Sequence, residues 1–182
     1  ASPQHENLDA GYYVIGYLVN TPSLGITYGG KLRIPLGISF FPEHFHESRG
    51  LYAAADSSWG KSPRPQGGHV LFRLNGAVAW ASRRLKVIAD STSEAETAEA
   101  SRASKTVIFG RTVLEGRRRP VLGPTALLTD SSAMYDAVAK DGMSSRTRYF
   151  ERATIFVKYA FAKLIVIVFK VTTDEMVADI FT

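Results

Sequence analysis

The alternation of apolar and polar positions divides the chain into a helical start and a longer region of strands and helices. Apolar residues recur at helical spacing over residues 3–20, which predicts a helix there. Residues 25–41 then resemble strands that are interrupted by Pro35. We therefore treat residues 1–50 as an N-terminal extension and residues 51–182 as the main domain.

In the main domain, a group of three strands precedes an alternation of helices and strands. The predicted strands are 51–56, 69–76, 77–85, 124–130 and 163–171, and the predicted helices are 90–116, 131–140, 149–162 and 172–182. The dipeptide Asn75-Gly76 separates the second and third strands and favours a tight hairpin. This order predicts an α/β fold of the mixed α+β kind, with a five-stranded mixed sheet and helices on both faces.

Composition narrows the possible partners. Hydrophobic residues make up 45% of the chain, enough for a packed core, and the absence of cysteine excludes disulfides and thiolate metal sites. The net charge of +5 is compatible with a polyanionic partner. The most apolar run, residues 164–171, is too short to cross a bilayer, which needs about 20 residues. We expect no membrane partner.

Four acids occupy positions that suit a metal site. Asp56 and Asp130 end predicted strands, Glu96 lies on the long helix, and Asp179 lies on the last helix. Carboxylates gathered in one place need a cation between them, and a site of oxygen ligands without cysteine favours Mg²⁺ or Mn²⁺. Two such ions about 4 Å apart can hydrolyse a phosphodiester. From spacing alone, the alternative is that the acids are separate helix caps and strand ends.

Four motifs, in the same order and at similar distances, resemble the RNase H domain of copia-type retrotransposon polyproteins. They are YAAADSSWGKSPRPQGGHVLFRLNGAVAWASRR (52–84), STSEAETAEA (91–100), LLTDSSAM (127–134) and VTTDEMVADIFT (171–182). Residues 1–30 are similar to the segment that joins reverse transcriptase to RNase H in those polyproteins, with His5, Ala10 and Tyr17-Leu18 at matching places.

The resemblance implies an RNase H-like fold that cleaves the RNA strand of RNA/DNA hybrids. By position in the motifs, Asp56, Glu96, Asp130 and Asp179 would hold two Mg²⁺ ions, with Mn²⁺ as a possible substitute. Asp56 would lie between the two ions. The implied partners are the hybrid and the reverse transcriptase segment of the same polyprotein, and the implied location is the cytoplasm or retrotransposon particles. Secretion of a processed chain is the alternative location.

Basic residues supply candidates for contacts to the nucleic acid. A hybrid is close to A-form, so a protein grips it through phosphates and 2′-hydroxyls. We expect these contacts from Arg83 and Arg84 after the third strand, and from Arg146 and Arg148, which a family signature covers. Further basic candidates, with solvated surface as their alternative role, are Lys86 and residues 117–119.

The chain also departs from the family pattern. Ser131 replaces an asparagine after the third acid, and Ser144 and Tyr149 replace two histidines. We expect these changes to affect substrate binding and catalytic rate more than metal binding. They motivate a rival hypothesis, in which the fold is catalytically decayed or repurposed as a nucleic-acid-binding or protein-interaction module.

Overall fold

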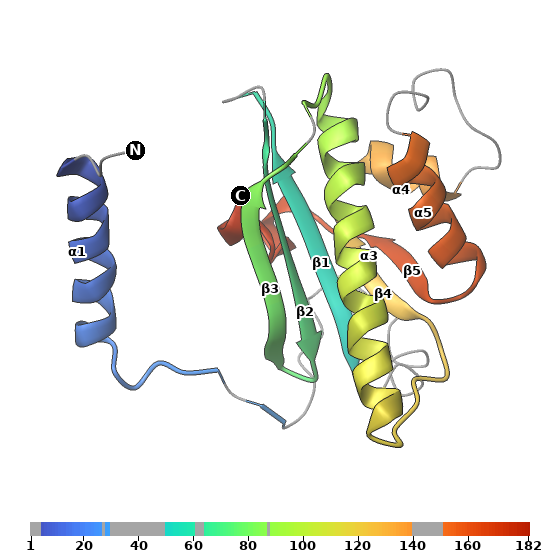
Figure 1. The fold of residues 1–182 in the computed structure, drawn as a ribbon, viewed down its shortest axis with the longest axis horizontal. Helices are drawn as coiled ribbons and strands as arrows, with labels where there is room; N and C mark the ends of the chain where they lie inside the picture. Colours follow the sequence, from blue (N-terminus) through green and yellow to red (C-terminus); the bar gives the residue numbers. More distant parts are fainter. Residues whose placement is uncertain (1–4, 27, 30–49, 61–63, 87, 140–150) are drawn as a thin grey trace.

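A five-stranded mixed sheet forms the centre of the protein in this computed structural model (Figure 1). The structure describes residues 5–26, 28–29, 50–60, 64–86, 88–139 and 151–182. The strands are β1 (Leu51–Ser58), β2 (Gln66–Arg73), β3 (Gly76–Arg84), β4 (Thr125–Thr129) and β5 (Val166–Lys170). The helices are α1 (His5–Asn20), α3 (Thr92–Gly116), α4 (Ser132–Ala139) and α5 (Glu151–Ala162), and two 3-10 turns are η2 (Thr173–Glu175) and η3 (Asp179–Phe181).

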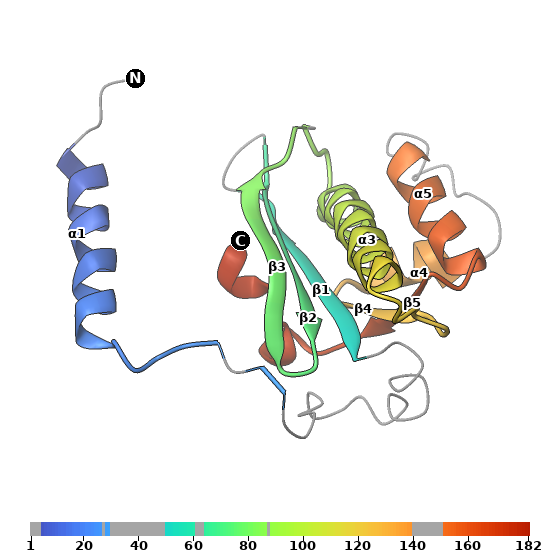
Figure 2. The same ribbon diagram turned by 60° about the horizontal axis from the view of Figure 1, so that its bottom comes forward.

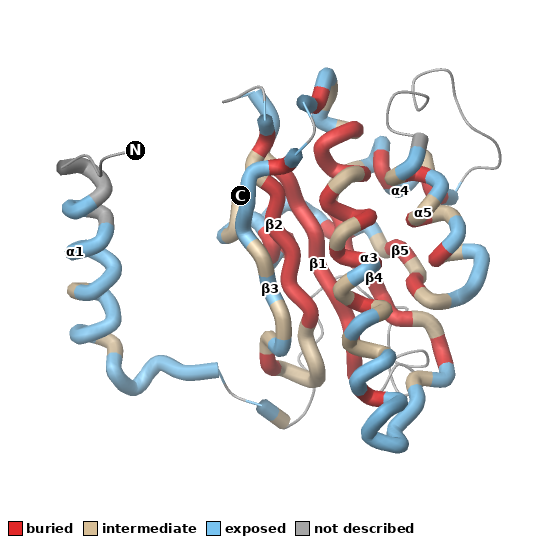
Figure 3. The backbone as a smooth tube through the Cα atoms, in the orientation of Figure 1, coloured by how far each residue is buried: buried red, intermediate tan, exposed pale blue. Residues whose placement is uncertain are grey.

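The strand order is β3-β2-β1-β4-β5, with β1 buried at the centre (Figure 3). β1, β2 and β3 pair antiparallel, whereas β4 runs parallel to β1 and to β5. All five strands and the helices α1, α3, α4 and α5 agree with the sequence-based prediction to within three residues at either end. The predicted five-stranded mixed sheet is therefore confirmed.

The hairpin between β2 and β3 turns one residue earlier than expected. Arg73 pairs with Gly76, so that the turn residues are Leu74 and Asn75, and Leu74 adopts a φ of 56°. Gly76 serves close packing instead, because a Cβ there would lie 2.3 Å from the ring of Tyr28. The Tyr28 hydroxyl also donates to the carbonyl oxygen of Ala77 at 3.0 Å.

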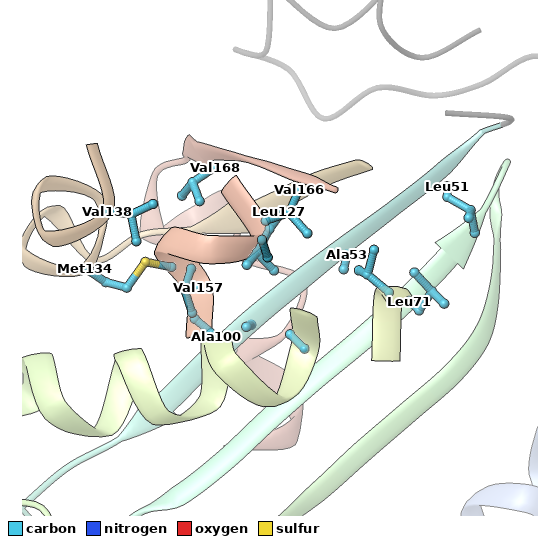
Figure 4. Close-up of a cluster of buried hydrophobic side chains, with 14 of the residues drawn as sticks. Leu51, Ala53, Leu71, Ala100, Leu127, Met134, Val138, Val157, Val166 and Val168 are labelled. Atoms are coloured by element: carbon cyan, nitrogen blue, oxygen red, sulfur yellow. The ribbon is translucent and has the colours of Figure 1, made fainter. Parts of the chain in front are cut away.

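The helices α3, α4 and α5 all pack on one face of the sheet (Figures 1 and 2). Figure 4 shows the apolar core between them, where Leu71 and Leu127 of the sheet meet Ala100, Met134 and Val157 of the helices. The opposite face carries Tyr52, Ala54, Val70 and Leu128, and the C-terminal segment covers it with Met176 and Ala178. In the described part of the chain, α-helices thus cover one face rather than the expected two.

The predicted helix over residues 172–182 is wrong. The segment forms two 3-10 turns, because Met176 takes an extended conformation (φ −76°, ψ 92°) that ends the first turn. Met176 and Ala178 are buried while Val177 between them is exposed. Residues two positions apart point to opposite sides of an α-helix, so burial of both Met176 and Ala178 excludes a continuous helix here.

The extension before the sheet is helical where it was predicted to be. α1 stands apart from the sheet in Figures 1 and 2, and its large apolar side chains from Leu8 to Val19 are exposed. The described residues of 25–29 form no strand, and the rest of the predicted strand region lies outside the described residues. Among the described residues, we find no helix with both the length and the apolar character to cross a membrane.

A buried polar network fastens α3 to β2. His69 Nδ1 lies 2.5 Å from Glu99 Oε1, and the two side chains are 4% and 0% exposed. His69 Nε2 lies 2.9 Å from the hydroxyl of Thr106, and Arg102 reaches the other oxygen of Glu99 at 3.4 Å. Gly67 makes room for this network, because a Cβ there would lie 2.3 Å from Glu99 Oε2.

Replacing Glu99 with alanine should lower the free energy of unfolding by about 3 kcal/mol. The substitution removes the carboxylate that pairs with the buried His69, and it leaves a cavity. Arg102→Ala is the matched control, since its partly exposed ion pair should contribute less than about 1 kcal/mol. Urea denaturation followed by circular dichroism measures both changes. Equal losses for the two variants would contradict the network as an anchor of α3.

Candidate metal centre

Asp56 and Asp130 meet because β1 and β4 are parallel. The register pairs Tyr52 with Ala126 and Ala54 with Leu128, so two further residues along each strand bring Asp56 level with Asp130. Asp56 is buried near the end of β1, and Asp130 follows the last residue of β4 at intermediate exposure. The carboxyl ends of the two strands therefore place both acids at one edge of the sheet.

Glu96 comes to the same edge from the first turns of α3. Ser91 caps the helix by accepting from the backbone N–H of Glu94, whose carboxylate accepts from the backbone N–H of Asp90. Glu94 is thereby engaged in the cap. Glu96 instead faces β1, where its Oε1 accepts from the backbone N–H of Ser57 at 3.2 Å and from the Ser57 hydroxyl at 2.9 Å.

Three of the four predicted acids come together. Oxygen atoms of Asp56, Glu96 and Asp130 all lie within 4.8 Å of one another, and Asp179 is not part of this group. Asp179 is exposed in η3, but its charge still contributes to raising the pKa of Asp56. The role of Asp179 as a metal ligand stays a prediction.

The electrostatics of the cluster favour a bound cation. Burial, followed by the charges of Asp56 and Asp130, raises the pKa of Glu96 to about 8. Burial also raises the pKa of Asp56, with a further contribution from Asp130, although hydrogen bonds from Thr182 and Ser57 oppose that shift. Like charges held in a buried site destabilise one another unless a positive ion joins them. A donor set made only of carboxylate oxygens fits a hard divalent metal.

Two hydroxyl groups at this edge escaped the sequence-based prediction. Thr182 donates to Asp56 Oδ2 at 2.7 Å, and Thr173 donates to Asp130 Oδ2 at 3.0 Å. Both threonines lie in the same C-terminal motif as Asp179, but only the folded segment shows which carboxylate each one reaches. Ser57, the partner of Glu96, directly follows Asp56 in the sequence.

The predicted basic contacts lie at different distances from the cluster. Arg83 and Arg84 are exposed at the end of β3, and Arg83 lies across β2 from Ser57, two strands or about 10 Å away. Lys86 is exposed just beyond them. Residues 117–119 follow the far end of α3, about 30 Å from Glu96 along the helix. Arg146 and Arg148 lie outside the described residues.

Comparison with known proteins identifies the fold. No protein-family model matches the sequence, and no curated protein matches it either. Among solved structures, RNase H1 from the halophilic archaeon Halobacterium salinarum matches with a TM-score of 0.56 at 16% identity, over 72% of this chain and 92% of that one. LC11-RNase H1 in complex with an RNA/DNA hybrid matches with a TM-score of 0.54 at 12% identity, over 72% and 92%.

A third similar structure is a retroviral fusion. The foamy viral protease-reverse transcriptase in complex with an RNA/DNA hybrid matches with a TM-score of 0.56 at 14% identity, over 87% of this chain and 22% of that one. At such identities the likeness establishes the fold alone. The chain has the RNase H fold, as the sequence predicted.

Proposed function

We propose that the protein is a metal-dependent endonuclease that hydrolyses the RNA strand of RNA/DNA hybrids, within or derived from a copia-type retrotransposon polyprotein. The observation that carries this proposal is the cluster of Asp56, Glu96 and Asp130 within 4.8 Å, at the carboxyl edge of an RNase H fold. Two of the similar structures contain an RNA/DNA hybrid, which supports the choice of substrate.

In this mechanism the protein supplies a rigid anionic site. Mg²⁺, or Mn²⁺ in its place, would activate the attacking water and stabilise the leaving oxygen when bound. Asp56, Glu96 and Asp130 would hold the ions, with Asp56 between the two, and Ser57 fixes one oxygen of Glu96. No protein nucleophile is needed, and the products would carry 3′-hydroxyl and 5′-phosphate ends. Asp179 would be the fourth ligand.

The substrate would lie across the edge of the sheet that carries the acids. Arg83 and Arg84, which are exposed at the end of β3, would contact phosphates, and Arg146 and Arg148 would add contacts. Phosphate contacts position a duplex without reading its sequence, which suits an enzyme that acts on any hybrid. The reverse transcriptase segment would be the protein partner, in the cytoplasm or in retrotransposon particles.

A second candidate function is that of a decayed or repurposed RNase H-like module that binds nucleic acid or protein without cleavage. The position of Asp179 outside the three-acid group favours this rival. An intact two-metal site would need a fourth acid, or another oxygen ligand, in its place.

Cleavage assays separate the two candidates. The full chain is incubated with end-labelled RNA/DNA hybrid, double-stranded DNA or double-stranded RNA, in Mg²⁺, in Mn²⁺ and in EDTA. We expect cuts in the RNA strand of the hybrid only, and none in EDTA. Binding of the hybrid without cleavage in either metal would support the module instead. Cleavage of double-stranded DNA would overturn the assigned substrate.

A further inference from the structure

The C-terminal segment brings two hydroxyl groups to the metal centre. Thr182 donates to Asp56 Oδ2 at 2.7 Å, and Thr173 donates to Asp130 Oδ2 at 3.0 Å. With the Ser57 hydroxyl on Glu96 Oε1 at 2.9 Å, each of the three clustered carboxylates accepts a hydrogen bond from a hydroxyl. The arrangement repeats at all three acids, although the donors come from two separate parts of the chain.

Packing fixes the segment that carries the two threonines. Met176 and Ala178 are 4% and 0% exposed and lie in the apolar cluster on the face of the sheet away from α3. Phe181 lies directly over Gly68, where a Cβ would meet the Phe181 side chain at 2.4 Å. The Ser82 hydroxyl donates to the carbonyl oxygen of Phe181 at 2.5 Å, which fastens the end of the segment to β3.

A hydroxyl donor has a particular consequence at an acidic metal site. A lysine or arginine in the same place would also hold the carboxylate, but its charge would compete with a divalent ion. A neutral hydroxyl fixes the rotation of the carboxylate and leaves the negative charge of the cluster unchanged. For Asp56, the hydroxyl of Thr182 holds Oδ2 while the carboxylate stays within 4.8 Å of Glu96 and Asp130.

We propose that Thr182 and Thr173 are positioning residues that orient Asp56 and Asp130 as ligands for the divalent ions. The proposal rests on the proposed function of the site, since it takes the cluster to be the metal centre. In this way the C-terminal segment would raise metal affinity through hydrogen bonds. This role is separate from any direct ligation of metal by Asp179.

The test measures metal binding without nucleic acid. Mn²⁺ binding to the full chain is followed by electron paramagnetic resonance for Thr182→Val and Thr173→Val, because valine keeps the shape and removes only the hydroxyl. Loss of such an outer hydrogen bond should weaken Mn²⁺ binding about 10-fold or more in each variant. Thr182→Ser and Thr173→Ser should restore binding to within about 3-fold of the wild type, since serine retains the donor.

Thr172→Val is the matched control within the same segment. Its hydroxyl donates to Glu175 Oε2 at 3.2 Å, outside the three-acid group, so its loss should leave Mn²⁺ affinity unchanged. Thermal unfolding in EDTA identifies any variant that fails to fold, and the serine variants keep the proposal testable in that case.

Two results would overturn the proposal. One is wild-type affinity in both valine variants, and the other is binding by the serine variants that is as weak as that of the valine variants. Because the readout is ion binding, its outcome is independent of cleavage. A protein that cuts no hybrid, but loses Mn²⁺ affinity in the valine variants, would contradict the nuclease function and still support the positioning role.

Discussion

Asp56→Asn should abolish metal-dependent cleavage of the hybrid, with a fall in kcat/KM of at least about 10³-fold. Asp56 is the buried acid at the end of the central strand, within 4.8 Å of both Glu96 and Asp130. The amide keeps the size of the side chain, but it removes the negative charge that would hold the ions. It also relieves repulsion within the cluster, so the variant should fold at least as stably as the wild type in the absence of metal.

Steady-state cleavage of a fluorophore-labelled hybrid in Mg²⁺ measures this loss. Asp174→Asn is the matched control, because Asp174 is an exposed acid of the C-terminal segment outside the three-acid group. It should retain the wild-type rate to within about 2-fold, as expected for a surface substitution away from the site. Wild-type activity in Asp56→Asn would show that the observed cleavage comes from a contaminating nuclease.

The positions of the acids differ in how far the sequence could predict them. Asp56 and Asp130 each follow a run of apolar strand residues. Because those two strands pair in parallel, their carboxyl ends, and so the two acids, lie at the same edge of the sheet. Only the resemblance to a family motif selects Glu96 among the acids of the long helix. The structure supplies the physical reason, since Glu94 is occupied at the helix cap while Glu96 faces Ser57.

The position of Asp179 could not be derived in the same way. The acids Asp174 and Glu175 favour a helix start, and apolar residues follow them at spacings that a helix would accept. Burial of both Met176 and Ala178 against the sheet requires a break in the helix, which the extended conformation of Met176 provides between two short 3-10 turns. That packing is a property of the assembled sheet, so the local pattern predicted the wrong element.

The sequence-based prediction started the second strand at residue 69, three residues too late, because glycines lie at its true start. β2 begins at Gln66 and includes Gly67 and Gly68, although glycine is disfavoured in strands. Both glycines are needed for close approach from opposite faces, because Glu99 lies against Gly67 and Phe181 against Gly68. The contacts that require them come from residues far along the chain, which a local pattern cannot reveal.

The metal-free protein should become more stable when Glu96 is replaced by glutamine. Burial and the neighbouring acids raise the pKa of Glu96 from 4.5 to about 8 in the folded state. Between these values the folded chain holds a proton that the unfolded chain has lost, so stability falls as pH rises through this window. Even half of the shift corresponds to about 2 kcal/mol, or about 5 °C in Tm for a chain of this size.

Glutamine cannot ionise, and its carbonyl oxygen can still accept a hydrogen bond from Ser57. The Glu96→Gln variant therefore does not lose the stability that the wild type loses when Glu96 ionises in the folded state. In EDTA, its Tm should exceed that of the wild type by about 5 °C above pH 8 and converge with it near pH 4.5. Excess Mg²⁺ should reverse the order, because an ion that binds the folded wild type raises its Tm and finds one ligand fewer in the variant. Differential scanning calorimetry across this pH range, with and without Mg²⁺, measures both effects. A wild type that is the more stable protein in EDTA above pH 8 would show that Glu96 is not held among repelling charges, and the electrostatic case for a cation at this cluster would then fail.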